Sequence, residues 1–407
     1  MEYIFHLQKK VFKKLILAFI ILYSSYLIVD IFLHTDNYLW DFKVYYSAGK
    51  AVADGENPYD VEVINSIIPT PGKLSFVYPP ITLTIWYIFS LADYSVSAYL
   101  FLILKCAMLA VLIVLWMREF LNKEFDILFL LFLLFAYRST IYLDLSTGNV
   151  TVFEQVLIWF AFYFFLKERN ILFCALIFVA ALFKLTPLLF LVLLVLANVK
   201  NKYLYVFGTL SIFLILQIAS YVQFPSLGTH FIQNIGSLDE KGVINPSLMA
   251  MFEDIAIAFS DYTNIQQFQF IDFSVFLIFA ITIAILTFRY SMIIMRCNQS
   301  DKGKKVVLFL VCLGYALILP RFKNYAFILL IVPSYFLMRK VPKLYLPLFI
   351  LIAFSPVPQI AMTGFYFFSK LLGQYYSIIM AFCVWISYCL LYTSDAADEL
   401  DGVDLGG

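Results

Sequence analysis

The sequence predicts an all-α polytopic membrane protein with about twelve membrane-spanning helices. Of its 407 residues, 63% are hydrophobic and only 14% are charged, a composition far from that of soluble globular domains. Apolar runs recur along almost the whole chain, and a helix needs about 20 apolar residues to cross a bilayer. We therefore expect one helical membrane domain rather than a soluble domain with an anchor.

The first apolar run follows four lysines and lacks a small-residue cleavage site, so we interpret it as an uncleaved span rather than a signal peptide. The run 171–198 is longer than one untilted crossing and carries Lys184 and Pro187 near its middle. We interpret this run as two short spans that meet at the outer face, and a single kinked helix is the alternative. The candidate runs are 15–34, 95–116, 127–137, 150–166, 171–198, 203–224, 273–295, 306–319, 325–338, 344–354 and 365–390.

The charges orient these spans. A cytoplasmic N-terminus places more than half of the 28 Lys and Arg residues on short inner segments, as the positive-inside rule requires. In this register, segment 78–92 is not a span, because counting it as one would reverse every later loop. Pro79 and Pro80 suit the first turn of a helix, and Trp86 and Tyr87 suit a membrane interface. We expect this segment to lie flat at the outer interface.

These assignments give one multispan membrane domain, residues 1–388, with a first outer loop at 35–94 and a second long outer loop at 225–272. From about Cys389 the chain becomes acidic and rich in small residues. Residues 389–407 resemble a reading frame through a sequencing adapter, so we interpret them as a non-native tail and exclude them from fold reasoning. A natural acidic tail is the alternative.

Several classes of site have no support in the sequence. The six cysteines and three histidines lack metal-ligand spacing, so we expect no metal site and no disulfide framework. The phosphate-binding GxxxxGK[ST], the dinucleotide-binding GxGxxG and the zinc-protease HExxH patterns are all missing. A formal net charge of +1 gives no sign of a nucleic-acid partner. We expect no cofactor, whether a divalent metal assists stays open, and membrane lipids are the surroundings that the composition implies.

The first outer loop begins with a segment suited to acid–base chemistry. Asp41 precedes Phe42, Tyr45, Tyr46 and Gly49 at roughly helical spacing, which predicts a helix on the membrane surface with Asp41 at its N-terminal end. The helix dipole favours a carboxylate there. From these residues alone, Asp41 is either a functional carboxylate or a helix cap.

Three cations lie near the outer membrane surface in this topology. Lys184 lies inside an apolar run, where a charge costs about 2.5–3.5 kcal/mol on insertion scales, and Arg321 and Lys323 lie between two apolar runs. They either extend to the interface and form ion pairs, or bind a lipid phosphate. The outer loops also carry two amide side chains beside small residues, Asn149 and Asn245.

Six segments stand in a recognisable order, namely "DFKVYYSAGKAVADGENPYD", "FVYPPITLTIW", "STGNVTVF", "ALFKLTPLLFLV", "INPSLMAMF" and "LPRFKNYAFILL". Together they resemble the bacterial glycosyltransferase family 87, multispan enzymes of the GT-C type, over about residues 38–338. "TGNV" stands where many members have Gly-Gln-Asn, and "NPSL" stands where many have Asn-Gln-Ser-Leu. These departures leave the sugar and the acceptor open.

The resemblance implies a GT-C-like bundle with interfacial helices in the first outer loop. It implies a polyprenyl-phosphate sugar, commonly mannose, as donor, and a lipid or glycan acceptor at the outer face of the plasma membrane. The family's catalytic aspartate corresponds by motif to Asp41, a general base for an inverting displacement. Lys184, Arg321 and Lys323 would stabilise the phosphate charge. Tyr45 and Tyr46 either stack on the sugar or anchor the helix, and the remaining substrate-binding candidates are Asn149 and Asn245.

Two other classes of function compete with this one. A transporter or flippase of a lipid-linked or small polar substrate would use Lys184 at the membrane midplane and Pro187 as a helix break. It predicts inverted hydropathy repeats, and the sequence shows none. A scaffolding membrane protein would not gather cations at one side of the membrane.

Overall fold

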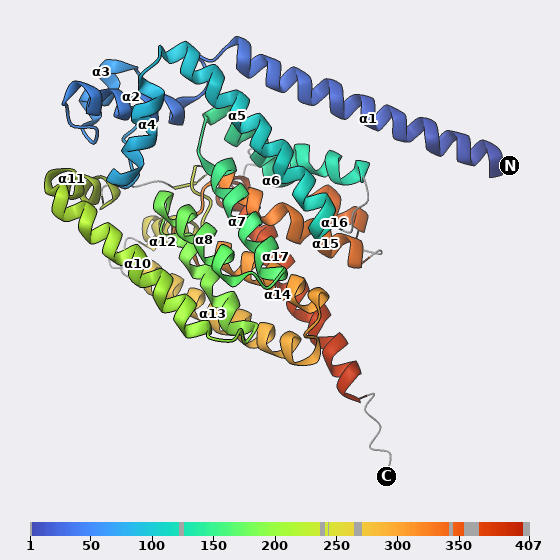
Figure 1. Ribbon diagram of the computed structural model, residues 1–407. Coiled ribbons are helices and arrows are strands. Elements are labelled where there is room, and N and C mark those ends of the chain that lie inside the picture. Colours follow the sequence, from blue (N-terminus) through green and yellow to red (C-terminus); the bar gives the residue numbers. More distant parts are fainter. Residues whose placement is uncertain are drawn as a thin grey trace. The chain divides into compact units, whose positions relative to one another are not determined.

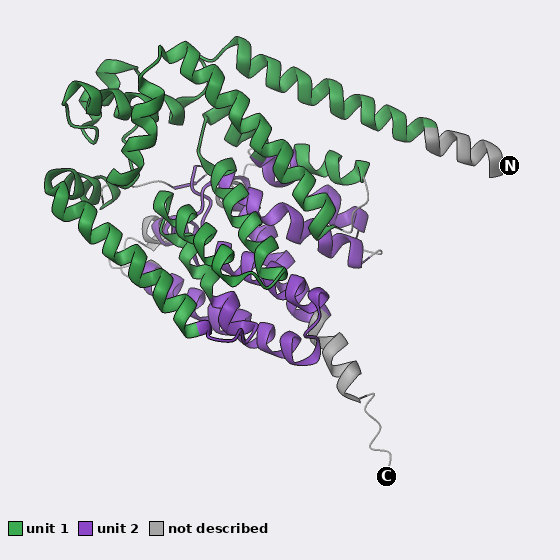
Figure 2. Cartoon of the chain, viewed as in Figure 1, with its two compact units in different colours: residues 1–134, 141–191, 203–239 green, residues 135–140, 192–202, 240–407 purple. Residues whose placement is uncertain are grey.

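The computed structural model describes residues 2–121, 126–236, 241–242, 244–263, 271–341, 345–353 and 366–401, with backbone only at 2–10, 259–263, 271–272, 366–370 and 392–401. Every regular element in these ranges is a helix (Figure 1), so the prediction of an all-α protein is confirmed for them. The chain forms two compact units (Figure 2). The first contains residues 1–134, 141–191 and 203–239, and the second contains residues 135–140, 192–202 and 240–407.

The first unit combines long apolar helices with a group of short ones. Helix α2 packs on α3 and α4, and α7 packs on α5 and α8. Gly49 permits the close approach of α2 to α4, because a Cβ there would overlap the Trp86 carbonyl group. The elements are α1 (Glu2–Leu33), α2 (Trp40–Asp54), α3 (Val61–Ile67), η1 (Pro80–Thr82), α4 (Leu83–Ser90), α5 (Tyr94–Leu115), the π-turn η2 (Trp116–Phe120), most of α6 (Ile127–Thr147), α7 (Thr151–Leu166), α8 (Asn170–Phe183), η3 (Thr186–Leu191), α10 (Lys202–Gln223) and α11 (Pro225–Gly236).

The second unit is built mainly from the C-terminal part of the chain. Helix α17 packs on α12, α13 and α14, and α13 also packs on α14. The elements are α9 (Val192–Leu196), α12 (Leu248–Thr263), α13 (Ile271–Cys297), α14 (Asp301–Ile318), η5 (Asn324–Leu330), α15 (Ile331–Lys340), α16 (Tyr345–Ala353) and α17 (Tyr366–Asp401).

Six helices of the described chain are long and apolar enough to cross a membrane, which supports a membrane-embedded helical protein. The expected count of about twelve is not confirmed, because several predicted spans correspond to shorter helices, such as α7 and α8. The six are Val11–Leu33, Tyr94–Phe120, Ile127–Thr147, Lys202–Gln223, Phe273–Cys297 and Leu371–Leu391.

The apolar run 171–198 consists of separate helical pieces. Helix α8 ends at Phe183, Lys184 has an extended backbone with φ −141° and ψ 131°, and η3 begins at Thr186. Pro187 lies in the first turn of η3, where its missing N–H leaves no hydrogen bond unmade. The run is therefore divided into separate helical pieces rather than formed by one continuous helix, and that each piece crosses the membrane stays a prediction. The face of the membrane at which they meet stays a prediction.

Segment 78–92 contains η1 and α4 rather than a span. Helix α4 has eight residues and is therefore about 12 Å long, too short to cross a bilayer. Pro80 is the first residue of η1, as expected. That this segment lies at the outer interface stays a prediction.

The segment between the candidate spans 127–137 and 150–166 is mostly helical rather than a loop, because α6 continues to Thr147. A left-handed turn interrupts α6, with φ values of 49°, 64° and 56° at Tyr137, Arg138 and Ser139. Left-handed residues other than glycine cost about 1–3 kcal/mol each, and neither Gly nor Pro marks this break in the sequence. The turn redirects the helix where we expected the span to end.

Two segments defined from the sequence, the second outer loop and the C-terminal tail, lie partly outside the described residues. The second predicted outer loop, 225–272, contains α11 and α12, whereas residues 237–240, 243 and 264–270 lie outside the description. The backbone of the predicted tail 389–407 is helical as far as Asp401, and 402–407 lie outside it.

Candidate active site

Asp41 lies in the first turn of α2, as its spacing predicted. Leu39 occupies the N-cap position with φ 59°, and no side chain caps the helix, so the alternative that Asp41 is the cap is not what the structure shows. The Leu39 N–H donates to the Ser146 carbonyl group at 2.7 Å. This bond fixes the start of α2 beside the end of α6, with Asp41 half-buried.

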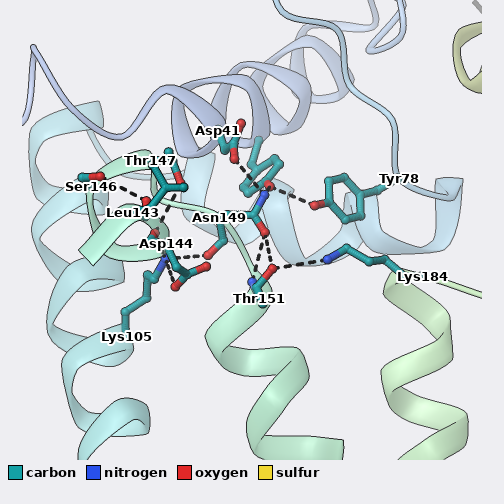
Figure 3. Close-up of polar contacts among 11 residues, drawn as sticks. Asp41, Tyr78, Lys105, Leu143, Asp144, Ser146, Thr147, Asn149, Thr151 and Lys184 are labelled. Atoms are coloured by element: carbon teal, nitrogen blue, oxygen red, sulfur yellow. Dashed lines mark hydrogen bonds and ion pairs between the residues drawn. The ribbon is translucent and has the colours of Figure 1, made fainter. Parts of the chain in front are cut away.

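Asn149 holds the Asp41 carboxylate in one orientation (Figure 3). Its Nδ2 donates to Asp41 Oδ2 at 2.7 Å and to Tyr45 Oη at 3.1 Å. Its Oδ1 accepts the Thr151 N–H at 3.1 Å and the Thr151 hydroxyl at 2.7 Å. The amide of Asn149 is therefore fixed on both sides. Among the described residues, no group donates a hydrogen bond to Asp41 Oδ1, so that oxygen can accept a proton.

The end of α6 places Asn149 by local backbone geometry. The Gly148 N–H donates to the Leu145 carbonyl and the Asn149 N–H to the Asp144 carbonyl, both at 3.3 Å, which is a Schellman motif. Gly148 has φ 69°, and a Cβ there would lie 2.9 Å from Phe42 Cβ. Both the left-handed backbone and the contact with α2 therefore require glycine at this position.

Tyr45 and Tyr46 are both buried in the first unit. The Tyr45 ring stacks on Trp86 with 4.5 Å between centroids, and its hydroxyl lies 3.0 Å from the Tyr78 hydroxyl. Burial raises the pKa of Tyr78, so this hydroxyl stays protonated at neutral pH. Tyr46 donates to the Ala92 carbonyl group at 2.9 Å. These contacts anchor α2, and stacking of either ring on a sugar stays a prediction.

Lys184 belongs to the same hydrogen-bond network and forms an ion pair, one of the two alternatives stated for it, with a carboxylate that the sequence did not identify. Its Nζ lies 2.7 Å from Glu154 Oε2 and donates to Thr151 Oγ1 at 3.3 Å. The Lys184 side chain is 29% exposed, whereas that of Glu154 is 6% exposed. Thr151 and Asn149 connect Lys184 to Asp41. Because Glu154 offsets its charge, Lys184 adds little net positive charge to the site on its own.

A second ion pair, between Lys105 and Asp144, contacts Asn149 on the side away from Lys184 (Figure 3). Lys105 Nζ lies 2.8 Å from Asp144 Oδ2, and both side chains are 0% exposed. The ammonium also donates to the carbonyl groups of Asp144 and Asn149, both at 2.6 Å. Sequence reasoning missed this pair, although a lysine within the run 95–116 carries the same membrane cost as Lys184.

The second unit contains the other predicted site residues. Asn245 is 5% exposed, and its Oδ1 accepts the Phe322 N–H at 2.9 Å, so it holds the backbone between Arg321 and Lys323. Lys323 Nζ lies 5.9 Å from the centroid of the Tyr325 ring. The first unit thus brings together Asp41, Tyr45, Asn149 and Lys184, and the second brings together Asn245, Arg321 and Lys323.

Metal-ligand residues do not cluster in the part of the chain that the structure describes: no group of three or more His, Cys, Asp or Glu side chains is placed to hold an ion. That the reaction needs no cofactor stays a prediction, and assistance by a divalent metal stays open.

Comparison with known proteins gave one family. The model of glycosyltransferase family 87 matches residues 76–320, which include Asn149, Lys184 and Asn245 but neither Asp41 nor Arg321. No curated protein and no solved structure matches the chain. Because the matched region covers more than half of the sequence, the chain belongs to glycosyltransferase family 87.

Proposed function

We propose that this membrane glycosyltransferase moves a hexose from a polyprenyl-phosphate sugar to a hydroxyl group of a lipid or glycan acceptor. The family supports glycosyl transfer, and the apolar helices support a membrane location. The observation that carries the proposal is the Asp41 carboxylate, with Oδ2 held by Asn149 at 2.7 Å and Oδ1 available. We place the reaction at the outer face of the plasma membrane, with a cytoplasmic N-terminus.

The proposed reaction is a direct displacement with Asp41 as general base. The acceptor oxygen forms a bond to the anomeric carbon while its proton passes to Asp41 Oδ1. The bond between the anomeric carbon and the phosphate oxygen breaks, and its electron pair leaves with the polyprenyl phosphate. This leaving group needs no proton, so one carboxylate suffices where glycoside hydrolases use two. Attack from the face opposite the phosphate inverts the anomeric carbon.

Positive charge near the departing phosphate would stabilise the transition state. In the first unit, Lys184 is the candidate hydrogen-bond donor to the phosphate, since its side chain is partly exposed and bonded to the network that holds Asp41, while Glu154 offsets its net charge. For Arg321 and Lys323 we retain the proposal, based on sequence, that they bind the lipid phosphate. We propose no cofactor, because the lipid-linked sugar is a substrate, and assistance by a divalent metal stays an open alternative.

The donor can be identified directly. Purified protein would be incubated with radiolabelled polyprenyl-phosphate sugars and a membrane extract that supplies acceptors, with the mannosyl donor tested first. We expect label to move from one donor to an acceptor, with loss of that donor. Movement of intact donor across a vesicle membrane without transfer would instead support a transporter.

Asp41→Asn tests the proposed base. Asparagine keeps an oxygen that can accept the Asn149 hydrogen bond but cannot take a proton at neutral pH, so we expect normal folding and a kcat reduced by about 10²-fold or more. Donor binding should survive. Asp36→Asn is the matched control, because Asp36 is an exposed acid in the same segment. Turnover of Asp41→Asn near that of the parent protein would show that the carboxylate is only structural.

A further inference from the structure

We infer that Lys105 is a positioning residue for the proposed base Asp41, and that it acts through the backbone of Asn149. The inference rests on the proposed function, and it gives a role to a buried ion pair that the reaction itself does not use. Every residue involved belongs to the first unit.

The Lys105 ammonium is enclosed by the protein. It donates to the carbonyl oxygens of Asp144 and Asn149 at 2.6 Å each, and it forms an ion pair with Asp144 Oδ2 at 2.8 Å. Its side chain and that of Asp144 are 0% exposed. Lys105 must therefore act on the protein itself.

The two carbonyl groups lie at the two ends of the turn that closes α6. Residues 144 and 149 are the first and last of the Schellman motif, whose own hydrogen bond between them is 3.3 Å long. A single ammonium bonded to both carbonyl groups fixes the distance across this turn, and hydrogen bonds from a charged donor are stronger than neutral ones. The backbone position of Asn149 therefore depends on Lys105.

The side chain of Asn149 transmits this position to Asp41. Its amide is bonded to Asp41 Oδ2 at 2.7 Å and to both donors of Thr151. A shift of the Asn149 backbone would therefore move the group that orients the carboxylate. Misplacement of a reacting group by about 1 Å can cost about 10²-fold in rate.

The competing explanation is that the Lys105–Asp144 pair only stabilises the fold. Removing one partner leaves an unpaired buried charge, which destabilises strongly, whereas replacing both with uncharged residues of similar volume is often neutral. Asp144 supplies the charge opposite to that of Lys105 whether the pair positions Asn149 or only stabilises the fold. The double variant Lys105→Met/Asp144→Asn thus removes the positioning bonds without leaving a buried charge.

The first measurement is steady-state kinetics of the double variant, with its unfolding temperature in detergent as a check on folding. We expect unfolding close to the parent, kcat reduced by about 10-fold to 10²-fold, and a donor KM changed by less than about threefold, because the bonds lost do not contact substrate. A folded double variant with parental kcat would overturn the inference. The control is Lys50→Met/Asp54→Asn, which removes an exposed ion pair of 3.3 Å from α2 and should leave kcat unchanged.

The second measurement combines the double variant with Asn149→Ala. If Lys105 acts through Asn149, the triple variant should turn over no more slowly than Asn149→Ala alone, because contributions along one chain of contacts do not add. Losses that multiply would show that Lys105 acts by another route and would overturn the assigned mechanism.

Hydrogen–deuterium exchange gives a readout that needs no substrate. In the double variant, amide exchange in residues 144–151 should become about tenfold faster, because the turn opens more often, while exchange in α3 stays as in the parent. Unchanged exchange in residues 144–151 would show that Lys105 does not fix the turn. If the parent protein transfers no sugar, the proposed function fails. The exchange of residues 144–151 then decides by itself whether Lys105 positions Asn149.

Discussion

Lys105 and Lys184 are both lysines in apolar helical regions of the first unit, yet their surroundings differ. Lys105 lies in the middle of α5 with no exposed side-chain surface, donates to two carbonyl groups and forms an ion pair with Asp144. Lys184 follows the last residue of α8 at a break in the helix and is 29% exposed. The same feature in the sequence, a cation in an apolar run, thus gives a structural contact in one case and a candidate ligand in the other.

The position of each lysine relative to a helix end explains this difference. Lys105 lies on a face of α5 that the rest of the chain covers, and its partners are the Asp144 and Asn149 groups on that face. Lys184 lies where α8 stops, at a position with extended backbone, and its side chain is partly exposed. Both lysines have a carboxylate partner, Asp144 or Glu154, so the presence of an ion pair does not separate the two roles.

Of the substitutions that test the contrast between Lys105 and Lys184, Lys105→Met alone should have the largest effect, a loss of folding stability. It leaves the buried Asp144 carboxyl group without its partner, so we expect the free energy of unfolding to fall by about 3–5 kcal/mol. Thermal unfolding in detergent, followed by circular dichroism, measures the change. A loss below about 1 kcal/mol would mean that the Lys105 site admits water, and the contrast with Lys184 would disappear.

Lys184→Met should have a smaller effect on stability and a clear effect on the donor. Glu154 is 6% exposed, so we expect a loss of about 1–3 kcal/mol for an acceptor left without its partner. The KM for the polyprenyl-phosphate sugar should rise by about tenfold, because a hydrogen bond to a charged group contributes about 1.5–3 kcal/mol. An unchanged donor KM, measured with the parent as reference, would place Lys184 with Lys105 as a structural lysine.

Glu154→Gln should have the smallest effect and sharpens the role of Lys184. It removes the charge that offsets Lys184, so attraction for a phosphate should increase and the donor KM should fall by about twofold to fivefold, as expected for a part-exposed charge pair. Titration with labelled donor measures this change. A rise in KM would instead show that the carboxylate is needed to hold Lys184 in place.

Local sequence signals predicted the elements that carry the site. The spacing after Asp41 predicted α2 with that residue in its first turn. Lys184 and Pro187 indicated the break after α8, and Pro80 indicated the start of a short helix. Each of these signals lies within a few residues of the feature it predicts.

The contacts that complete the site could not be predicted, because they join residues far apart in sequence. Asn149 is 108 residues from Asp41, and Glu154 is 30 residues from Lys184. The left-handed turn in α6 was missed for a different reason, since Tyr137, Arg138 and Ser139 carry none of the usual signals for such a backbone. The sequence shows Lys105 as a charge within an apolar run, but it does not indicate that Asp144 is its partner.

The distance in sequence between Lys105 and Asp144 has a consequence for synthesis of the protein. Lys105 emerges from the ribosome 39 residues before Asp144, so α5 must enter the bilayer while its ammonium still has no partner, at a cost of about 2.5–3.5 kcal/mol. The segment Tyr94–Phe120 is the most apolar of the six candidate spans in the described chain, and this offsets that cost. Substitutions that make α5 less apolar should therefore reduce its insertion during translation, even where the folded protein would tolerate them.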